Sequence, residues 1–213
     1  MKKNVAKIFV TLITLLLFIS PFVEAKRSSA RNIASDVRYF SDGSIVRGGI
    51  STVSTDENGA KMNLHTYGLQ NGHAVTIWWV IFNHPENCEH GQLPYRCGEG
   101  DLFGSGEYYP QTSMVYATGR IIGPDGIGDF SASLPKYSTL GALFGPGLTN
   151  PMGADIHLII RDHGKALPIL FKKQLTTFNG GCIYDPEERT YGSNICTNVQ
   201  FSVHEQVKDL DED

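Results

Sequence analysis

The sequence lacks several signatures that would assign an activity directly. No serine lies in a Gly-x-Ser-x-Gly elbow, and no glycine-rich phosphate loop is present. Apolar residues show no helical period beyond the first 25 residues, and only 19% of the residues are charged, with a net charge of −4. These absences argue against a serine hydrolase of the α/β type, a phosphate-loop nucleotide-binding protein and a helical bundle. They also give no electrostatic reason to expect nucleic acid as a partner.

The first 25 residues have the layout of a secretory signal peptide. Three lysines within the first seven residues precede an apolar run from Ile8 to Ile19, Pro21 ends that run, and residues 23–25 (VEA) suit a cleavage site. The run is shorter than the roughly 20 residues that a membrane-spanning helix needs. We therefore predict a secreted or periplasmic protein that has no membrane span after cleavage, with an uncleaved anchor as the alternative. The sequence contains no Asn-x-Ser/Thr triplet, which fits a bacterial export route.

Four cysteines, all after the predicted signal, point to disulfides. In an oxidising compartment an even number of cysteines favours bridges, and four cysteines allow three pairings. We predict Cys88–Cys97 and Cys182–Cys196, because each pair encloses a short segment rich in turn residues. A four-cysteine zinc site is the alternative, but the spacings lack the close pairs of zinc ribbons.

Short alternating segments separated by turn residues predict an all-β protein. The chain has 23 Gly and 10 Pro, and its apolar residues recur with the period of two that is typical of half-buried strands. We expect a single antiparallel β-sandwich or flattened barrel with long loops held by disulfides. The predicted boundaries are a signal peptide over residues 1–25, a flexible lead-in over 26–36, the all-β domain over 37–207 and an acidic tail over 208–213.

Individual strands follow from the same pattern. The segment Ala74–Phe82 (AVTIWWVIF) is apolar on both faces, which predicts a central strand covered on both sides. Asn58-Gly59 predicts a hairpin between residues 49–53 and 61–69. A second hairpin is expected over Met114–Leu134, around residues 123–126. Further strands are expected at residues 154–161, 174–178 and 198–207, with at most a short helical turn near 138–144 or 167–172.

Two connections are too long for hairpin loops and are therefore candidates for function. They are Asn83–Gln111, which contains the first predicted disulfide, and Gly145–Pro151. The side chains that we expect to contact a partner are Tyr95, Phe103, Glu107, Tyr108 and Tyr109. The longer loop also carries five carboxylates that could bind Ca²⁺, although their spacing differs from that of an EF-hand; they are Glu86, Glu89, Glu99, Asp101 and Glu107.

Histidines on the polar faces of strands suggest a metal site. His65 and His157 each alternate with core-facing residues, and His163 lies where the strand of His157 ends. If those strands are neighbours, these imidazoles could bind Cu or Zn, with His204 as a further candidate. The alternative is that each histidine is a separate surface or hydrogen-bonded residue.

Three segments resemble sequences of known families. Gly68–Cys88, Tyr116–Leu134 and Gly153–Pro168 resemble an exported bacterial family of uncharacterised proteins, in which an "IHL…R.HG" segment precedes a Gly-Gly-Cys turn like residues 180–182. More weakly, the chain is similar to chordin-type domains, which implies a β-sandwich that acts in binding. The chain has the single His157 where such domains often have a His-Ile-His triplet. Neither resemblance implies a catalytic residue.

We therefore expect an exported, non-catalytic binding module whose partner is a protein, a glycan or a small molecule. Alanine at Tyr108 and Tyr109 should then weaken partner capture without lowering the melting temperature. One alternative is an extracytoplasmic metal-dependent enzyme that uses Cu or Zn with His65, His157 and His163 as ligands. The other is a small-molecule carrier with an apolar pocket inside the barrel.

Overall fold

A computed structural model describes residues 30–92, 94–104, 106, 108–184 and 192–206. The predicted signal peptide and acidic tail lie outside these residues. Within the described ranges, no helix is both long enough and apolar enough to cross a membrane.

The described residues form one antiparallel sheet, which confirms the predicted fold class. Its nine strands lie in the order β6-β3-β2-β1-β9-β8-β4-β5-β7 in the part of the chain that the structure describes. The strands are β1 (Arg31–Tyr39), β2 (Ile45–Asp56), β3 (Gly59–Thr66), β4 (His73–Phe82), β5 (Thr112–Ile121), β6 (Gly128–Pro135), β7 (Ala142–Phe144), β8 (Asp155–Lys165) and β9 (Thr197–His204). The helical pieces are short: η1 (Pro85–Asn87), η2 (Glu99–Asp101) and α1 (Phe171–Gln174).

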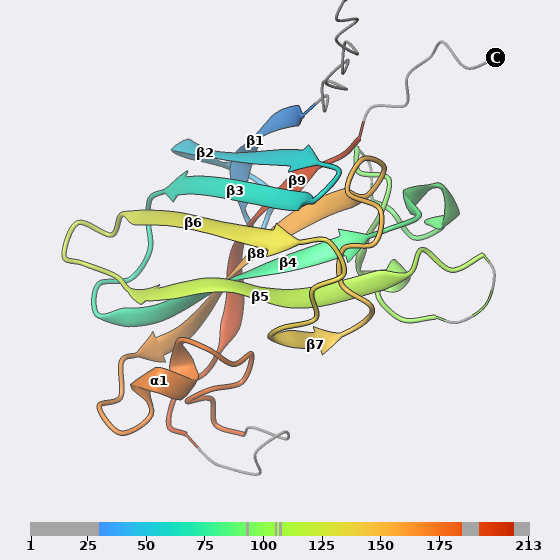
Figure 1. Ribbon diagram of the computed structural model, residues 1–213. Coiled ribbons are helices and arrows are strands. Elements are labelled where there is room, and N and C mark those ends of the chain that lie inside the picture. Colours follow the sequence, from blue (N-terminus) through green and yellow to red (C-terminus); the bar gives the residue numbers. More distant parts are fainter. Residues whose placement is uncertain (1–29, 93, 105, 107, 185–191, 207–213) are drawn as a thin grey trace, which may run out of the picture.

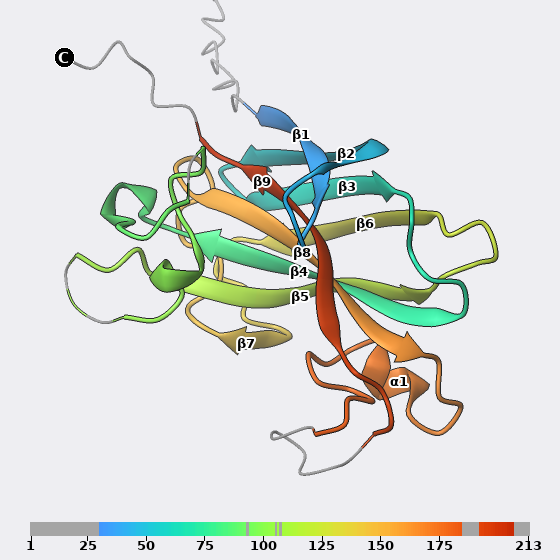
Figure 2. The ribbon, with the colours of Figure 1, turned by 180° about the vertical axis from the view of Figure 1, so that it is seen from behind.

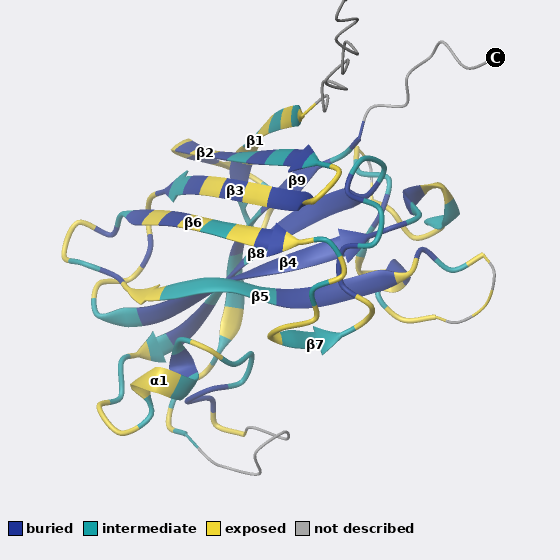
Figure 3. Ribbon diagram, in the orientation of Figure 1, coloured by how far each residue is buried: buried dark blue, intermediate teal, exposed yellow. Residues whose placement is uncertain are grey.

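The sheet curls over its own inner face, and the main core lies inside the curl (Figure 1, Figure 2). Inward side chains of β2, β3 and β6 join those of β4 and β8 in one buried cluster. Burying these apolar side chains is the main favourable contribution to folding. Figure 3 shows the resulting pattern, in which β3 and β6 alternate between buried and exposed residues whereas β4 is buried along its length.

Strand β4 is central, as its sequence predicts. It pairs with β8 on one side and β5 on the other. Its residues Ile77, Trp79 and Ile81 face the main core, whereas Trp78 and Phe82 belong to a second apolar cluster on the outer face. The outer cluster exists because loops cover this part of the sheet.

The β2–β3 hairpin also forms as predicted, with Asp56 accepting a hydrogen bond from the amide of Asn58 at 2.7 Å. Gly59 has a further role beyond the turn. A Cβ at this position would lie 2.2 Å from the carbonyl oxygen of Leu134, so glycine lets β6 approach β3 closely.

The predicted hairpin over Met114–Leu134 is wrong. Its turn is present, with the amide of Gly126 donating to Gly123 at 3.1 Å, but the two strands pair elsewhere in the described sheet. Strand β6 pairs with β3, and β5 pairs with β4 and β7. The turn therefore connects two strands that separate, and the curled sheet stays open between them.

Two other local predictions need correction. The lead-in expected over residues 26–36 overlaps β1, which starts at Arg31 and pairs with β2 and β9. The polar side chains of this segment do not predict a strand, but backbone hydrogen bonds to β2 and β9 hold it in the sheet. The strand expected at residues 174–178 is instead the end of α1 and a turn, because the hydroxyls of Thr176 and Thr177 donate to carbonyls four residues earlier.

Both predicted disulfides, Cys88–Cys97 and Cys182–Cys196, are present. They lie at opposite ends of β8. The segment Asn83–Gln111, here called the Cys88 loop, connects β4 to β5 near the start of β8, whereas α1 follows the end of β8 (Figure 1). Described residues 166–184 and 192–196, here called the Cys182 segment, include α1 and the second bridge.

Candidate functional site

The Cys88 loop is fixed to the sheet by an ion pair at its base. Arg96 donates two hydrogen bonds to Asp155, the first residue of β8, at 2.7 and 2.9 Å, and one to the carbonyl of Gln206 at 3.1 Å. The Asp155 side chain is fully buried. Burial raises the pKa of Asp155, while the guanidinium of Arg96 and the amide of Gln206 act in the opposite direction. Because Arg96 adjoins Cys97, the same contact also positions the disulfide.

A second carboxylate, that of Asp101, stabilises the Cys88 loop through hydrogen bonds to its backbone. The buried side chain of Asp101 accepts hydrogen bonds from the amides of Glu89, His90 and Gly98. Its carbonyl accepts the hydroxyl of Thr112 at 2.8 Å. The three amides already use the carboxylate oxygens of Asp101. This side chain therefore stabilises the loop and is not an open calcium ligand.

Asn83 ties the Cys88 loop to Gly145–Pro151, here called the Gly145 loop. Its side-chain nitrogen donates to the carbonyls of Gln111 and Gly147 at 2.8 and 2.9 Å. Its side-chain oxygen accepts from the amides of Thr149 and Asn150 at 2.7 and 3.2 Å. The residue is completely buried, so its hydrogen bonds are costly to lose. The sequence analysis missed this residue, although an asparagine directly after a buried strand is a usable signal.

The two loops meet in a shallow groove beside the edge strand β7. The Phe103 and Phe144 rings lie 5.1 Å apart between centroids, and Tyr109 and Pro146 extend the apolar lining. The groove residues are Leu102, Phe103, Gly104, Tyr109, Gln111, Thr112, Phe144, Gly145 and Pro146. Phe103 is 76% exposed even though the surrounding loop is anchored on several sides. An ordered, exposed aromatic beside an apolar groove is typical of an interaction site.

The predicted contact residues of the Cys88 loop have different roles. Tyr108 is 80% exposed, whereas Tyr109 donates its hydroxyl to the carbonyl of Leu102 at 2.7 Å and is half-buried. Tyr95 packs edge-on against Phe201 of β9, at 6.0 Å, and is not a groove residue. Glu107 lies outside the described residues.

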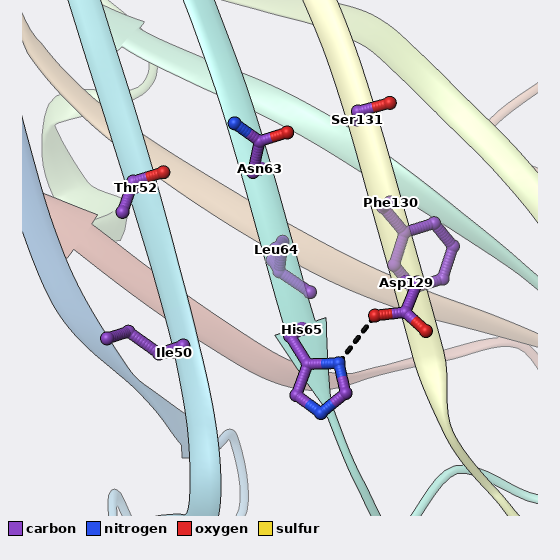
Figure 4. A pocket seen from close by; sticks show the side chains of 8 residues that line it. All are labelled: Ile50, Thr52, Asn63, Leu64, His65, Asp129, Phe130 and Ser131. Atoms are coloured by element: carbon purple, nitrogen blue, oxygen red, sulfur yellow. Dashed lines mark hydrogen bonds and ion pairs between the residues drawn. The ribbon is translucent and has the colours of Figure 1, made fainter.

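His65, the first predicted metal ligand, lies on the open outer face of β3. Its Nδ1 contacts the carboxylate of Asp129 on β6, and the Tyr67 ring meets it edge-on at 4.8 Å. Figure 4 shows the pair pointing toward each other, with Asn63 and Ser131 farther along the same two strands. In the strand register Ser131 pairs with Asn63, and Asp129 pairs with His65.

The same face carries mostly polar side chains, together with Ala34 and Ile50, in register across four strands. One row joins Ala34, Thr52, Asn63 and Ser131, and the next joins Asp36, Ile50, His65 and Asp129. The depression in Figure 4 lies over these rows. Its lining mixes polar side chains with Ile50, Leu64 and Phe130, and it is less apolar than the groove.

His157 and His204 are buried near the start of β8. Burial lowers the pKa of His157 to about 3 and that of His204 to about 4. His204 donates from Nδ1 to the carbonyl of Ile33 at 3.0 Å and accepts at Nε2 from Ser51 at 2.9 Å. Nε2 of His157 has no hydrogen-bond partner among the described residues. Both rings are therefore neutral parts of the packed interior.

His163 is buried at the other end of β8. Its Nδ1 donates to the carbonyl of Gly180 at 3.0 Å, and its Nε2 contacts the hydroxyl of Thr76 at 2.8 Å. Burial lowers its pKa to about 4. The structure does not bring His65, His157 and His163 together: within the described ranges, the one group of three potential ligands is His163 with Cys182 and Cys196. The carboxylates predicted to bind Ca²⁺ form no such group in the part that is described.

Comparisons with known proteins add no assignment. No protein-family model, curated protein or solved structure matches this chain. The resemblances to an exported bacterial family and to chordin-type domains therefore stay predictions.

Proposed function

We propose that this protein is an exported binding module that captures a partner polypeptide in the groove between the Cys88 and Gly145 loops. The observation that carries the proposal is Phe103, which is exposed on a loop that a disulfide, the Arg96–Asp155 pair and Asp101 hold in place. An anchored loop has already lost its conformational freedom, so binding costs less entropy.

A polypeptide suits this groove better than a sugar or an ion. The lining is mostly apolar, and aromatic or aliphatic side chains are the usual anchors of protein interfaces. Strand β7 lies at the edge of the sheet beside the groove and pairs only with β5 among the described strands. An extended partner segment could therefore add backbone hydrogen bonds to the apolar contacts.

Export is part of the same proposal. Two disulfides are compatible with an extracytoplasmic protein, and the first 25 residues have the layout of a signal peptide. The carrier alternative has less support, because Trp79, Ile77 and Leu158 fill the interior of the curled sheet.

The test is selection of ligands from a displayed peptide library and a glycan array on purified protein. Selected peptides should bind Phe103→Ala at least tenfold more weakly, because truncating an interface anchor typically costs 2 kcal/mol or more, roughly a thirtyfold loss. Ile169→Ala is the matched control, since Ile169 is 95% exposed in the Cys182 segment and should not affect binding. Peptides that bind Phe103→Ala as well as the native protein would contradict the proposal, as would selection of glycans alone.

A further inference from the structure

The Cys182 segment brings two sulfurs and one imidazole together. The ligand atoms of His163, Cys182 and Cys196 all lie within 4.8 Å of one another. The Nδ1 atom of His163 is 3.9 Å from the sulfur of Cys196. In the oxidised protein the sulfurs are bonded to each other, so they cannot both bind a metal as thiolates. The chemistry of the group therefore depends on its oxidation state.

We propose that reduction of the Cys182–Cys196 bridge creates a three-ligand site for Zn²⁺ or Cu⁺. Thiolate and imidazole are ligands that both ions favour. A dithiol reductant supplies two electrons and two protons and becomes a disulfide, while the bridge becomes two thiols. The metal then binds the two sulfurs and Nδ1 of His163, and the two thiol protons pass to solvent.

One nitrogen-to-sulfur distance already suits such an ion, whereas the carbonyl of Gly180, which accepts Nδ1–H at 3.0 Å, has to turn away from Nδ1. Bonds of about 2.3 Å from Zn²⁺ to sulfur and about 2.0 Å to nitrogen place tetrahedral ligand atoms about 3.5 to 3.8 Å apart. The observed separation of 3.9 Å between nitrogen and sulfur is already close to this value. After reduction, rotation of the cysteine side chains has to separate the two sulfurs.

The backbone around His163 is also held by side-chain hydrogen bonds, and Gln174, one of the two donors, lies outside the loop that the disulfide closes. The carbonyl of His163 accepts hydrogen bonds from the side-chain amides of Gln174 and Asn194, at 3.2 and 2.8 Å. Both amides also donate to the carbonyl of Lys165, at 2.9 and 2.7 Å. Gln174 is buried, and its side-chain oxygen accepts the amide of Leu167. The imidazole should therefore keep its position when the bridge is reduced.

The cysteines are also positioned by backbone contacts. Cys182 forms an isolated bridge with Asn194, and the amide of Ile183 donates to the carbonyl of Asn194 at 2.8 Å. Cys196 immediately precedes β9, which pairs with β8. Cys182 is thus positioned by its bridge to Asn194, and Cys196 by the strand that follows it.

Thr76 can support both states of the imidazole. In the oxidised form Nδ1 carries the proton that Gly180 accepts, so Nε2 accepts the hydroxyl of Thr76. A metal on Nδ1 moves the proton to Nε2, which then donates to the oxygen of Thr76. That oxygen already accepts Nε1 of Trp78 at 2.8 Å and has a second lone pair for His163. Such a contact orients a metal-binding histidine.

The experiment uses Co²⁺ as a coloured probe for a zinc site. In a Cys88→Ser, Cys97→Ser variant, the reduced protein retains only the two thiols of interest. We expect one equivalent of Co²⁺ to bind with thiolate-to-cobalt absorption, Zn²⁺ to displace it, and the oxidised variant to give no signal. His163→Gln and Cys196→Ser should each weaken binding at least tenfold, whereas His84→Ala, at a partly exposed position in the Cys88 loop, should leave it unchanged.

Circular dichroism of each reduced sample shows whether the sheet persists, and a rise in melting temperature with Zn²⁺ gives a second readout. The proposal fails if the reduced protein binds no Co²⁺ or if His163→Gln binds Co²⁺ as tightly as its parent. It also fails if binding appears only in urea. None of these outcomes bears on the groove, so the two proposals can fail separately.

Discussion

The two ends of β8 use similar disulfides for different purposes. At its start, the Cys88 loop is anchored by Arg96 and Asp155 and presents Phe103 to solvent. At its end, the Cys182 segment covers His163 and binds its backbone through Gln174 and Asn194. One bridge stabilises an exposed surface, whereas the other lies against a buried polar group. A disulfide alone therefore does not indicate whether a loop contributes to binding.

The largest expected effect is acid unfolding, to which both ends contribute. Below pH 6.5 the unfolded chain protonates His157, His163 and His204, whereas the folded chain, with pKa values of about 3, 4 and 4, does not. Stability should therefore fall as the pH drops from 6.5 to 4, by about 1.4 kcal/mol per pH unit for each histidine. Denaturant titrations across this range measure the slope.

Substitution separates the contributions of the two ends. His163→Gln should reduce the slope by about a third, and His157→Gln should do the same from the opposite end of β8. His84→Ala is the control, because this side chain is partly exposed. An unchanged slope in both buried-site variants would contradict the assignment of neutral, buried imidazoles.

The next largest effect concerns the base of the Cys88 loop. Arg96→Ala leaves the buried carboxylate of Asp155 without its cation and should cost about 3 to 5 kcal/mol at pH 7. The difference from the native protein should shrink at pH 5, because a protonated Asp155 no longer buries a charge. Arg47→Ala, at an exposed position of β2, should change the free energy of unfolding by less than about 0.5 kcal/mol. If the two variants lost the same free energy of unfolding, the proposed anchoring role of Arg96 would be wrong.

Removing either disulfide should cost a similar amount. The chain-entropy argument gives about 3 kcal/mol for each bridge, since the enclosed loops differ little in length. Binding should distinguish the bridges: the double serine variant at Cys88 and Cys97 should lose affinity for groove ligands, and the one at Cys182 and Cys196 should keep it. Calorimetry and peptide titration provide the two readouts. If both double serine variants bind groove ligands equally well, the two disulfides do not differ in their contribution to binding.

The smallest expected effect lies within the groove region. Tyr108→Ala should change stability by less than about 0.5 kcal/mol, because the side chain is exposed. Tyr109→Ala should cost about 1 kcal/mol or more, since it removes the hydrogen bond to Leu102 and half-buried ring contacts. The sequence-based expectation that neither substitution lowers the melting temperature thus applies to Tyr108 alone. Thermal unfolding of the two single variants tests the difference.

The sequence predicted those parts of the fold that depend on residues close together in the chain. Alternation correctly placed Met62 and Leu64 inside and His65 outside, and the two-faced apolar run identified β4. Short enclosed loops gave both cysteine pairings. Which strands pair with each other depends on residues far apart in the sequence. The sequence therefore wrongly predicted a hairpin of β5 with β6 and a flexible lead-in where β1 forms.

The candidate site was predictable in part for the same reason. Loop length and aromatic content pointed to Phe103 and to the Gly145 loop. The contact of Phe103 with Phe144 depends on tertiary structure, as do the buried bonds of Asn83. His65 stays apart because β3 lies three strands away from β9 and four from β8 in the sheet order, whereas His157 and His163 lie at opposite ends of β8.

The pairing of β1 with β9 determines when the sheet can be completed during folding. Residues Arg38 and Tyr39 pair with Phe201 and Gln200, and this short ladder joins the half-sheet β6-β3-β2-β1 to the half-sheet β9-β8-β4-β5-β7. Strand β1 can pair with β2 early, but its ladder with β9 can form only after the last described strand is available. Contacts so distant in sequence slow folding, and a chain synthesised from its N-terminus cannot form this ladder until nearly all of its residues are available.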